Sequence, residues 1–426
     1  MGLMLPVAVR LCSRSKNLVN ATMKSPDESI NWNKVRSQRA RESQRQQVSM
    51  LKNGNQMADA ALPLHKSIYT GDRRFEAEQK HIFLSQPLVA CLSGDISTAG
   101  DTILFDAAGP SILVTRSKDG EARAFLNMCT HRGAKLVEEA EPWSGVKNKL
   151  TCPFHAWTFD STGRLIGQPG KEGFEKCNIG GRNLIELPCA EHIGLVFVKA
   201  NPDAGPIDAE EFLGDYADVL AQLELWRAEP VKKGVLTAES NWKFALDTYG
   251  ESYHFKTLHK TTIAKTNYND KQVFYPFGMH HRIEFPNLST GDLIDKPESE
   301  WPETVYGGVH FLFPNTVIFF GAVADNVFFT QVFRLFPDGV GKTRCQFAVY
   351  APFGVESDSH KESCIAAYDA TATVVQEEDY RVASHGYANL LSAPQDHHVV
   401  LGANELALQI VHQHIAKIIG MPLEQK

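Results

Sequence analysis

The sequence predicts a two-domain α+β protein: a small all-β domain, then a larger domain in which helices cover an antiparallel sheet. Three observations carry this prediction. The chain has 426 residues, more than one hydrophobic core usually supports. Short β-rich segments separated by Gly, Asp and Lys dominate the region before residue 204. Beyond it, helical patterns accompany several long strands.

Residues 1–62 differ in composition from the rest of the chain. Between Arg10 and Arg45 there are nine Lys or Arg and three Asp or Glu, with few large apolar residues. A targeting peptide or a polyanion-binding arm is one interpretation. No apolar stretch precedes a cleavage-like site, so we expect a disordered extension, or an upstream start codon chosen ahead of Met23 or Met57.

Residues 63–204 are expected to form the all-β domain. Strands are predicted at Thr102–Phe105, Ser111–Thr115, Ala122–Asn127 and Ile193–Val198. The turn-rich stretch at 201–206 then marks the domain boundary, because Asn, Pro, Asp and Gly favour turns.

Residues 205–426 are expected to form the second domain. The apolar periodicity predicts four helices and at least three strands. The helices are Asp208–Trp226, Asn241–Tyr253, Ser359–Glu378 and Asn404–Ile419, and the strands are Lys233–Thr237, Val327–Phe336 and Thr343–Pro352. Such a domain is large enough to enclose a pocket, for which 310–320 and 327–333 are the expected lining.

Composition excludes several classes of protein. The net charge of −7 argues against a nucleic-acid partner, which requires a concentrated basic face. No stretch approaches the roughly 20 apolar residues of a membrane helix. Eight cysteines are too sparse for a disulfide scaffold, so we expect a reducing, cytoplasmic location and metal ligation instead.

The strongest chemical signal is a pair of short Cys and His patterns. Cys129 and His131 form C-x-H, and Cys152 and His155 follow as C-x-x-H after twenty residues. Two thiolates and two imidazoles could hold Zn²⁺ in a closed tetrahedral site. They could equally hold a [2Fe–2S] cluster, with both Cys on one iron and both His on the other.

The residues around these ligands resemble the Rieske family, whose two loops read C-x-H-R-G and C-P-[FY]-H-x-W. Arg132-Gly133 follows the first histidine and Trp157 follows the second. The resemblance implies a Rieske-type β domain with a [2Fe–2S] cluster held by Cys129, His131, Cys152 and His155. Ala156 departs from the Gly often found after the second cluster histidine, and we expect this change to be tolerated.

A second group of candidate ligands lies in the larger domain. Asn241-Trp242-Lys243 opens a segment that contains Glu251, His254 and His259. Two histidines five apart stand about 140° apart on an ideal helix, so they meet one ion only if the helix ends or distorts between them. Taken alone, this pair does not distinguish metal ligands from core histidines.

The same segment resembles the large (alpha) subunits of Rieske non-haem iron oxygenases, the aromatic-ring-hydroxylating dioxygenase family, which carry N-W-K, an acid and then H-x4-H. The resemblance implies a helix-grip-like catalytic domain in which His254, His259 and a downstream carboxylate bind one mononuclear Fe(II). Asp379 fits that position best, and Glu378 is the alternative. Glu251 is expected to bridge His254 to a cluster histidine of a neighbouring subunit.

Other residues near these candidate ligands are expected to have supporting or structural roles. Asp247 stands where many relatives have Asn, and we expect it to orient a ligand or line the electron path. Five histidines match no ligand position and are expected to be structural or exposed: His385, His397, His398, His412 and His414.

The resemblance implies the oxygenase component of a multicomponent system. Electrons from NAD(P)H would arrive through a reductase or ferredoxin, and O₂ would hydroxylate or dihydroxylate a small, aromatic or other apolar substrate. A homotrimer is expected, with or without a β subunit. One alternative is a demethylase or monooxygenase of a quaternary amine, with Tyr249, Tyr253 or Tyr306 as cage residues. Another is a Rieske electron carrier without oxygenase activity.

Overall fold

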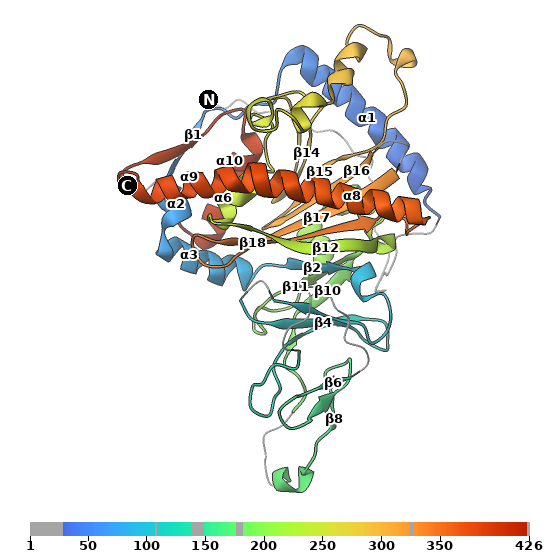
Figure 1. The fold of residues 1–426 in the computed structure, drawn as a ribbon, viewed down its shortest axis with the longest axis vertical. Coiled ribbons are helices and arrows are strands. Elements are labelled where there is room, and N and C mark those ends of the chain that lie inside the picture. The colour runs from blue at the N-terminus through green and yellow to red at the C-terminus, as the bar shows by residue number, and fades with distance from the viewer. Residues whose placement is uncertain (1–28, 107–108, 138–148, 176–181, 324–326, 424–426) are drawn as a thin grey trace, which may run out of the picture.

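The computed structural model describes residues 29–106, 109–137, 149–175, 182–323 and 327–423. It has a narrow end built from small sheets and a broad end built around one large sheet (Figure 1). Among these residues no helix is long and apolar enough to cross a membrane.

The narrow end contains three small antiparallel sheets, with strand orders β3-β4-β5-β9, β10-β11-β2 and β6-β7-β8. The β6-β8 sheet lies farthest from the large sheet (Figure 1). The strands are β2 (Leu88–Leu92), β3 (Thr102–Phe105), β4 (Ile112–Arg116), β5 (Ala122–Leu126), β6 (Leu150–Thr151), β7 (Thr158–Phe159), β8 (Leu165–Gly167), β9 (Glu186–Leu187), β10 (Cys189–His192) and β11 (Leu195–Val198). The four strands expected here are confirmed.

The broad end is built on a seven-stranded antiparallel sheet of order β12-β18-β17-β16-β15-β14-β13. The strands are β12 (Glu229–Ala238), β13 (Val273–Phe277), β14 (His280–Glu284), β15 (Gly308–Leu312), β16 (Thr316–Val323), β17 (Val327–Pro337) and β18 (Thr343–Ala351). The three expected strands are therefore confirmed, and they lie side by side at one edge of the sheet. A small sheet of β1 (Leu62–His65) and β19 (His398–Leu401) joins the two ends of the described chain.

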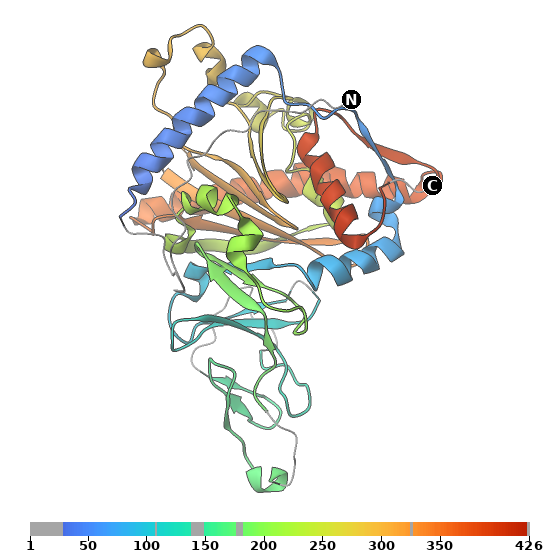
Figure 2. The same cartoon turned by 180° about the vertical axis from the view of Figure 1, so that it is seen from behind.

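Helices surround the large sheet. They are α1 (Trp32–Asn53), α2 (Ser67–Thr70), α3 (Asp72–Glu78), α4 (Ala209–Leu213), α5 (Tyr216–Ala221), α6 (Trp242–Asp247), α7 (Phe255–Leu258), α8 (Asp358–Val374), α9 (Tyr380–Ser392) and α10 (Leu406–Ile419). Helix α8 packs on β12, β17 and β18, and α1 contacts β13 at the other edge of the sheet. Figure 2 shows α1 and α10 on the side of the molecule turned away from α8.

Short helical turns complete the fold. Two are π-helical, η1 (Gln79–Phe83) and η9 (Val375–Asp379), and η9 joins α8 to α9 without a break. The remainder are 3₁₀ turns: η2 (Ser93–Ile96), η3 (Lys171–Phe174), η4 (Leu225–Arg227), η5 (Ile263–Lys265), η6 (Leu288–Leu293) and η7 (Glu298–Glu300).

The expectation of disorder before residue 63 is wrong for the part that the structure describes. Helix α1 begins at an N-cap, where the Asn31 side chain accepts from the Lys34 N–H at 3.0 Å. Arg36 forms a buried salt bridge to Glu224, and Trp32 packs edge-on against Trp226. These contacts are mostly polar, so an apolar pattern could not reveal the helix. Residues 1–28 lie outside the described chain.

Two expected helices are shorter than predicted. The segment 208–226 breaks into α4, α5 and η4, because Gly214 adopts a positive φ of 51° between the first two. The segment 241–253 ends as a helix at Asp247, and a new turn, α7, starts at Phe255. The last two expected helices are confirmed, with α9 extending the first of them to Ser392.

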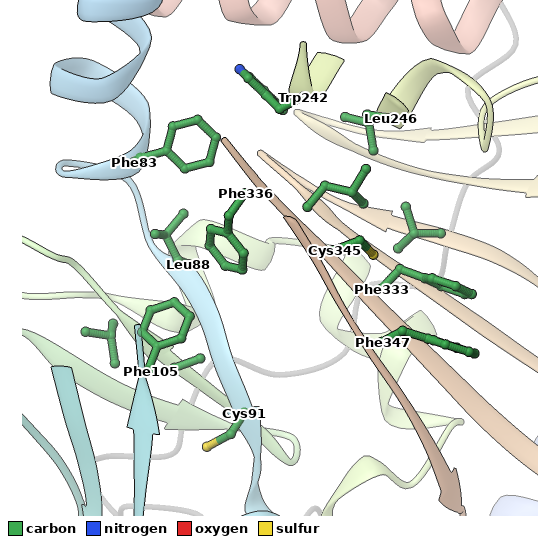
Figure 3. Packing of buried hydrophobic residues seen from close by; sticks show 14 of the residues in the cluster. Phe83, Leu88, Cys91, Phe105, Trp242, Leu246, Phe333, Phe336, Cys345 and Phe347 are labelled. Carbon is green, nitrogen blue, oxygen red and sulfur yellow. The ribbon is translucent and has the colours of Figure 1, made fainter. Parts of the chain in front are cut away.

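One hydrophobic core joins the narrow and broad ends. Phe105 of β3 packs on Phe336 of β17 at a ring separation of 5.5 Å, and Phe83 packs on Trp242 at 5.0 Å. Figure 3 shows Phe336 beside Leu88, with Phe83 and Phe105 on either side of the pair and Phe333, Cys345 and Phe347 farther across. The two parts of the chain therefore share their largest core.

Candidate metal centres

The Cys and His patterns of the narrow end lie on two loops, before β6 and between β6 and β7. Both thiols are buried, at 1% exposure for Cys129 and 2% for Cys152. The imidazoles of His131 and His155 lie beside each other with ring centroids 4.8 Å apart, and His155 is exposed. The structure thus pairs the thiols in the interior and the imidazoles toward the surface.

The two loops have the same backbone hydrogen bonds. Cys129 N–H donates to Ala134 O and Cys152 N–H to Trp157 O, each at 2.8 Å. In each loop the residue four after the cysteine, Gly133 or Ala156, donates back to that cysteine's carbonyl. Both residues have positive φ, 81° and 57°, so Ala156 holds a conformation that Gly adopts with less strain.

These four side chains do not surround one point. A tetrahedral zinc site would bring all four ligand atoms within about 4 Å of one another. Within the part of the chain that the structure describes, the one such set of three or more His, Cys, Asp or Glu ligand atoms, which lie within 4.8 Å of one another, is elsewhere, at 254, 259 and 379. Paired thiols and paired imidazoles fit a two-iron cluster better than a single ion.

The surroundings of the four side chains suit a cluster. Trp157 stacks on His131 with ring centroids 4.8 Å apart and an angle of 12° between the planes. Burial lowers the pKa of His131, and the neighbouring charges of His155 and Arg132 lower it further. Burial raises the pKa of Cys129, with the Cys152 thiol adding to the effect. The lowered pKa of His131 favours the neutral imidazole that a metal binds, whereas the Cys129 thiol must lose its proton to become a ligand.

His254, His259 and Asp379 converge in the broad end. The two Nε2 atoms are 3.0 Å apart, and Asp379 Oδ1 lies 3.5 Å from the first and 3.4 Å from the second. His254 and His259 flank the single turn of α7, at its N-cap and C-cap. The interruption of the helix after Asp247 is what turns both imidazoles toward one point.

The donor set fits a divalent metal with open positions. Three ligand atoms, two imidazole nitrogens and one carboxylate oxygen, lie within 4.8 Å of one another. Asp379 is 6% exposed, and its Oδ1 atom is buried without a hydrogen bond, which leaves it free to bind an ion. Burial opposes protonation of His259, but Asp379 and Glu378 outweigh it, so the pKa of His259 lies above its ordinary value when no metal is bound.

Each histidine also contacts a second carboxylate through its other nitrogen. Glu251 contacts His254 Nδ1 and accepts from the backbone N–H groups of Tyr253 and His254. Glu378 Oε2 lies 2.5 Å from His259 Nδ1 and accepts from Thr262 Oγ1 at 3.3 Å. Such partners fix the tautomer and orientation of metal-binding histidines.

The neighbouring acids therefore lie on opposite sides of the His259 ring. Asp379 faces Nε2 and Glu378 faces Nδ1. Both belong to the π-helical turn η9, whose wider spacing shifts the register between α8 and α9. The third acid of the run, Glu377, is exposed.

Asp247 lies in a buried hydrogen-bond network rather than at the metal-capable group. Tyr69 donates its hydroxyl proton to Asp247 Oδ2 at 2.7 Å, and His412 Nε2 lies 3.0 Å from Oδ1. His412 is fully buried, in line with the structural role expected of it. Sequence reasoning missed Tyr69 as a partner, because it is 178 residues away from Asp247.

The Asn241-Trp242-Lys243 segment anchors helix α6. Asn241 caps the helix by accepting from Lys243 N–H at 3.1 Å. Trp242 Nε1 donates to Glu78 at 2.9 Å, and Lys243 Nζ lies 2.7 Å from both oxygens of the same carboxylate. The side chains of Trp242, Lys243 and Glu78 are all buried. The contacts fix the start of the segment that carries the two histidines.

A cavity of about 930 Å³ opens beside the metal-capable group. Its lining includes His254, His259 and Asp379, residues of the sheet and α8, and one face of α1. From the expected segments, 310–320 and 327–333, it contains Val317, Phe319, Phe320, Phe329, Gln331 and Phe333. The volume falls in the range of ordinary small-molecule sites.

Two known protein families match segments of the chain. The family described as Rieske [2Fe-2S] domain matches residues 86–179. The family described as ring hydroxylating alpha subunit (catalytic domain) matches residues 223–421. The chain belongs to the Rieske ring-hydroxylating oxygenase family. The two matched domains imply a [2Fe–2S] cluster and a mononuclear iron, and the residues described above fit both groups.

Individual members of this Rieske family resemble the chain over part of its length. The carnitine monooxygenase oxygenase subunit of Acinetobacter baumannii is 29% identical over 206 residues, which are 47% of this chain and 53% of that protein. The 2-aminobenzenesulfonate 2,3-dioxygenase alpha subunit of an Alcaligenes species is 32% identical, over 52% and 57% of the two chains. The chain thus spans about half the length of the curated relatives it matches.

Solved structures of the family show the same fold over most of the chain. A crystal structure of the quaternary ammonium Rieske monooxygenase CntA matches with a TM-score of 0.71 and 24% identity, covering 84% of this chain and 96% of that one. At this identity the match shows the fold alone.

Proposed function

We propose that this Rieske-family chain is the oxygenase component of a multicomponent system, oxidising a small apolar substrate with O₂ and electrons from NAD(P)H. The observation that carries the proposal is the convergence of His254, His259 and Asp379 on the wall of a 930 Å³ cavity. A Rieske domain alone would serve an electron carrier, which needs no such second site. The intact donor set and the cavity favour the oxygenase.

When bound, the cluster and the iron supply one-electron transfer and the activation of O₂. In our proposal, Cys129, Cys152, His131 and His155 hold the cluster, and His254, His259 and Asp379 hold the iron. Glu251 and Glu378 keep the protons of the two imidazoles on Nδ1, so each Nε2 lone pair points to the shared position. The Phe and Val residues of the cavity exclude water and orient an apolar substrate.

The contact between the two centres is proposed to lie between subunits. The Rieske loops and the large sheet occupy opposite ends of the molecule (Figure 1). Each centre also carries an exposed aromatic residue: Phe154, 51% exposed, precedes His155, and Tyr253, 61% exposed, precedes His254. Exposed aromatics of this kind are typical of interface cores. A head-to-tail ring, such as a trimer, would bring His155 of one subunit to Glu251 of the next.

Complementation tests this arrangement directly. The variants Glu251→Gln and His155→Ala should each abolish turnover, and Glu251→Gln should keep both metals. Co-expression should restore part of the activity, because a mixed ring contains contacts in which both residues are intact. An active Glu251→Gln protein, loss of its mononuclear iron, or the absence of complementation in mixed rings would contradict the proposal.

Iron content separates the oxygenase from the electron carrier. An oxygenase chain should hold about three irons, and a carrier about two. Coupled O₂ uptake and product identification, with a ferredoxin or reductase as the electron donor, then test the activity. The partners, including any β subunit, and a cytoplasmic location belong to this proposal. The six described cysteines, all free, support a reducing compartment.

A quaternary amine is the second candidate substrate, favoured by the likeness to carnitine monooxygenase. The expected aromatic cage is not assembled from the three tyrosines named for it. Tyr253 is not among the cavity's lining residues, and Tyr249 lines the cavity but has its hydroxyl 2.9 Å from that of Tyr380. The ring of Tyr306 is already covered by the Arg282 guanidinium at 4.3 Å. The cavity therefore favours the apolar substrate.

A further inference from the structure

Helix α1 supplies one wall of the cavity. Ala40, Ser43, Gln44 and Gln47 line it, and their spacing of three, four and seven places them on one face of the helix. Helix α1 precedes both segments that match known families, at 86–179 and 223–421. This wall of the cavity is therefore formed by a segment outside the two matched domains.

The wall is held in place from both ends and from behind. Arg36 pairs with Glu224 near one end, and Arg45 pairs with Glu298 farther along at 2.6 Å. In the middle, Ser43 Oγ and Gln47 Nε2 donate to the two oxygens of Glu284 at 2.5 and 3.0 Å. The polar groups of α1 are thus fixed before any substrate binds.

Two amide N–H groups of this wall remain available to a ligand. A glutamine amide has two N–H donors. Gln44 uses one on Pro302 O at 3.5 Å, and Gln47 uses one on Glu284. An uncharged acceptor, such as a carbonyl, amide or hydroxyl oxygen, suits the remaining donors.

The described lining of the cavity offers an anionic substrate no Lys or Arg, and a cationic substrate only the exposed Glu303. Of its four acids, Glu284 pairs with the buried Arg282, Glu251 pairs with His254, and Asp379 faces the two histidines. The fourth, Glu303, is exposed to solvent. Burial of an unpaired carboxylate or ammonium costs several kcal/mol, so ions are disfavoured.

We propose that the cavity selects an uncharged substrate with an apolar, aromatic-sized body and one hydrogen-bonding group. The body lies among the Phe and Val side chains beside His254, His259 and Asp379, and the polar group lies against Gln44 and Gln47 of α1. This inference rests on the oxygenase function proposed above and names its substrate class. It makes α1 a specificity-determining element.

Matched probes test the charge preference by calorimetry, without O₂ or reductant. Three ligands share one ring system: 2-naphthamide is neutral, 2-naphthoate is anionic at pH 7.5, and 2-naphthyltrimethylammonium is cationic. The wild-type protein, loaded with iron, should bind the amide at least about tenfold more tightly than either ion, a difference of about 1.4 kcal/mol. Equal or tighter binding of either ion would overturn the proposal.

A charge placed on the α1 wall tests the location. Gln44→Lys should raise the affinity for 2-naphthoate at least about tenfold and lower that for 2-naphthamide, because it places a charge where Gln44 would bind the amide. Gln46→Lys is the control, because Gln46 is exposed on the same helix. Equal effects of the two variants would refute a wall formed by α1. Thermal unfolding checks that the variants fold, and Gln47→Lys replaces Gln44→Lys if that variant does not.

The binding test and the oxygenase test fail separately. A protein with two irons per chain and no O₂ uptake would refute the proposed function, whatever it binds. A protein with three irons and coupled uptake that prefers 2-naphthoate would keep the function and refute the substrate class.

Discussion

Replacing the three consecutive acids of η9 one at a time should give three different metal affinities. Asp379 Oδ1 lies 3.4 to 3.5 Å from both histidine Nε2 atoms, whereas Glu378 contacts Nδ1, on the far side of the His259 ring. Glu377 is exposed and contacts neither. Asp379→Asn should therefore remove a ligand, Glu378→Gln should weaken one, and Glu377→Gln should change nothing.

The size of the second effect follows from the contact that is lost. The 2.5 Å interaction between Glu378 Oε2 and His259 Nδ1 is charge-assisted, and Gln keeps the shape but not the charge. Substitution of such outer partners typically lowers metal affinity by about 10- to 100-fold. This corresponds to about 1.4 to 2.7 kcal/mol. Loss of the Asp379 carboxylate should lower the Fe(II) affinity by more than that range.

Competition with a chromogenic Fe(II) chelator measures these affinities on purified protein. The Rieske absorption spectrum should be the same in all three variants, because the proposed cluster ligands, Cys129, His131, Cys152 and His155, lie on other loops. If Glu378→Gln loses more affinity than Asp379→Asn, then Glu378 is the carboxylate ligand and our assignment is wrong. A large loss of Fe(II) affinity in Glu377→Gln would show that the substitutions act through net charge and not through a specific contact.

Three further predictions concern stability. Ala156→Gly should raise the free energy of unfolding by about 0.5 to 1 kcal/mol. The change relieves the strain of a positive φ of 57°, and this gain exceeds the extra chain entropy that Gly loses on folding. Burial lowers the pKa of His281 to about 3, against about 6.5 in an unfolded chain. His281 should therefore contribute a loss of about 1.4 kcal/mol per pH unit between pH 6.5 and pH 3, and His281→Gln should reduce the total slope by that amount, because burial also lowers the pKa of His280 and His310. Lys243→Met should cost up to about 3 to 5 kcal/mol, because the buried Glu78 carboxylate then keeps only Arg74, at 3.5 Å, as an ion partner, and Glu78→Leu should cost less in that variant than in the wild type.

Controls and contrary results are available for each of these. Ala134→Gly, in the other cysteine loop, should destabilise the protein, because Ala134 does not have a positive φ. Equal effects of the Ala134 and Ala156 substitutions would show that backbone strain at Ala156 is not the cause. His385 is exposed, so His385→Gln should keep the pH slope. Additive losses in the Lys243 and Glu78 double variant would mean that the pair does not interact. Thermal or urea unfolding at fixed metal content measures all of these effects.

The strands and the ligand-rich loops could be predicted from the sequence because their signals are local. Cys129 and His131 belong to one loop and Cys152 and His155 to another, each within four residues. The convergence of His254 and His259 needed knowledge of where a helix ends, which periodicity alone does not give. The break after Asp247 is a tertiary effect, since Trp242 and Lys243 are tied to Glu78 of another helix.

Two features could not be predicted for physical reasons. Helix α1 buries mainly polar or small residues, with Val48 and Met50 only near its end, so it lacks the continuous apolar stripe by which helices are recognised. The choice between Glu378 and Asp379 depended on a π-helical turn, which alters the direction of neighbouring side chains without a signal in the residue types.

The shared core between the narrow and broad ends limits how the chain can be divided. A fragment that stops near residue 204 would expose Phe83, Phe105 and Leu88, which pack on Trp242 and Phe336 of the remainder. Such a fragment should be prone to aggregate through this exposed surface, although the Cys and His loops also pack in a smaller core of their own around Phe125, Trp157 and Phe159. The same packing prevents the cluster loops from swinging toward the cavity of their own chain.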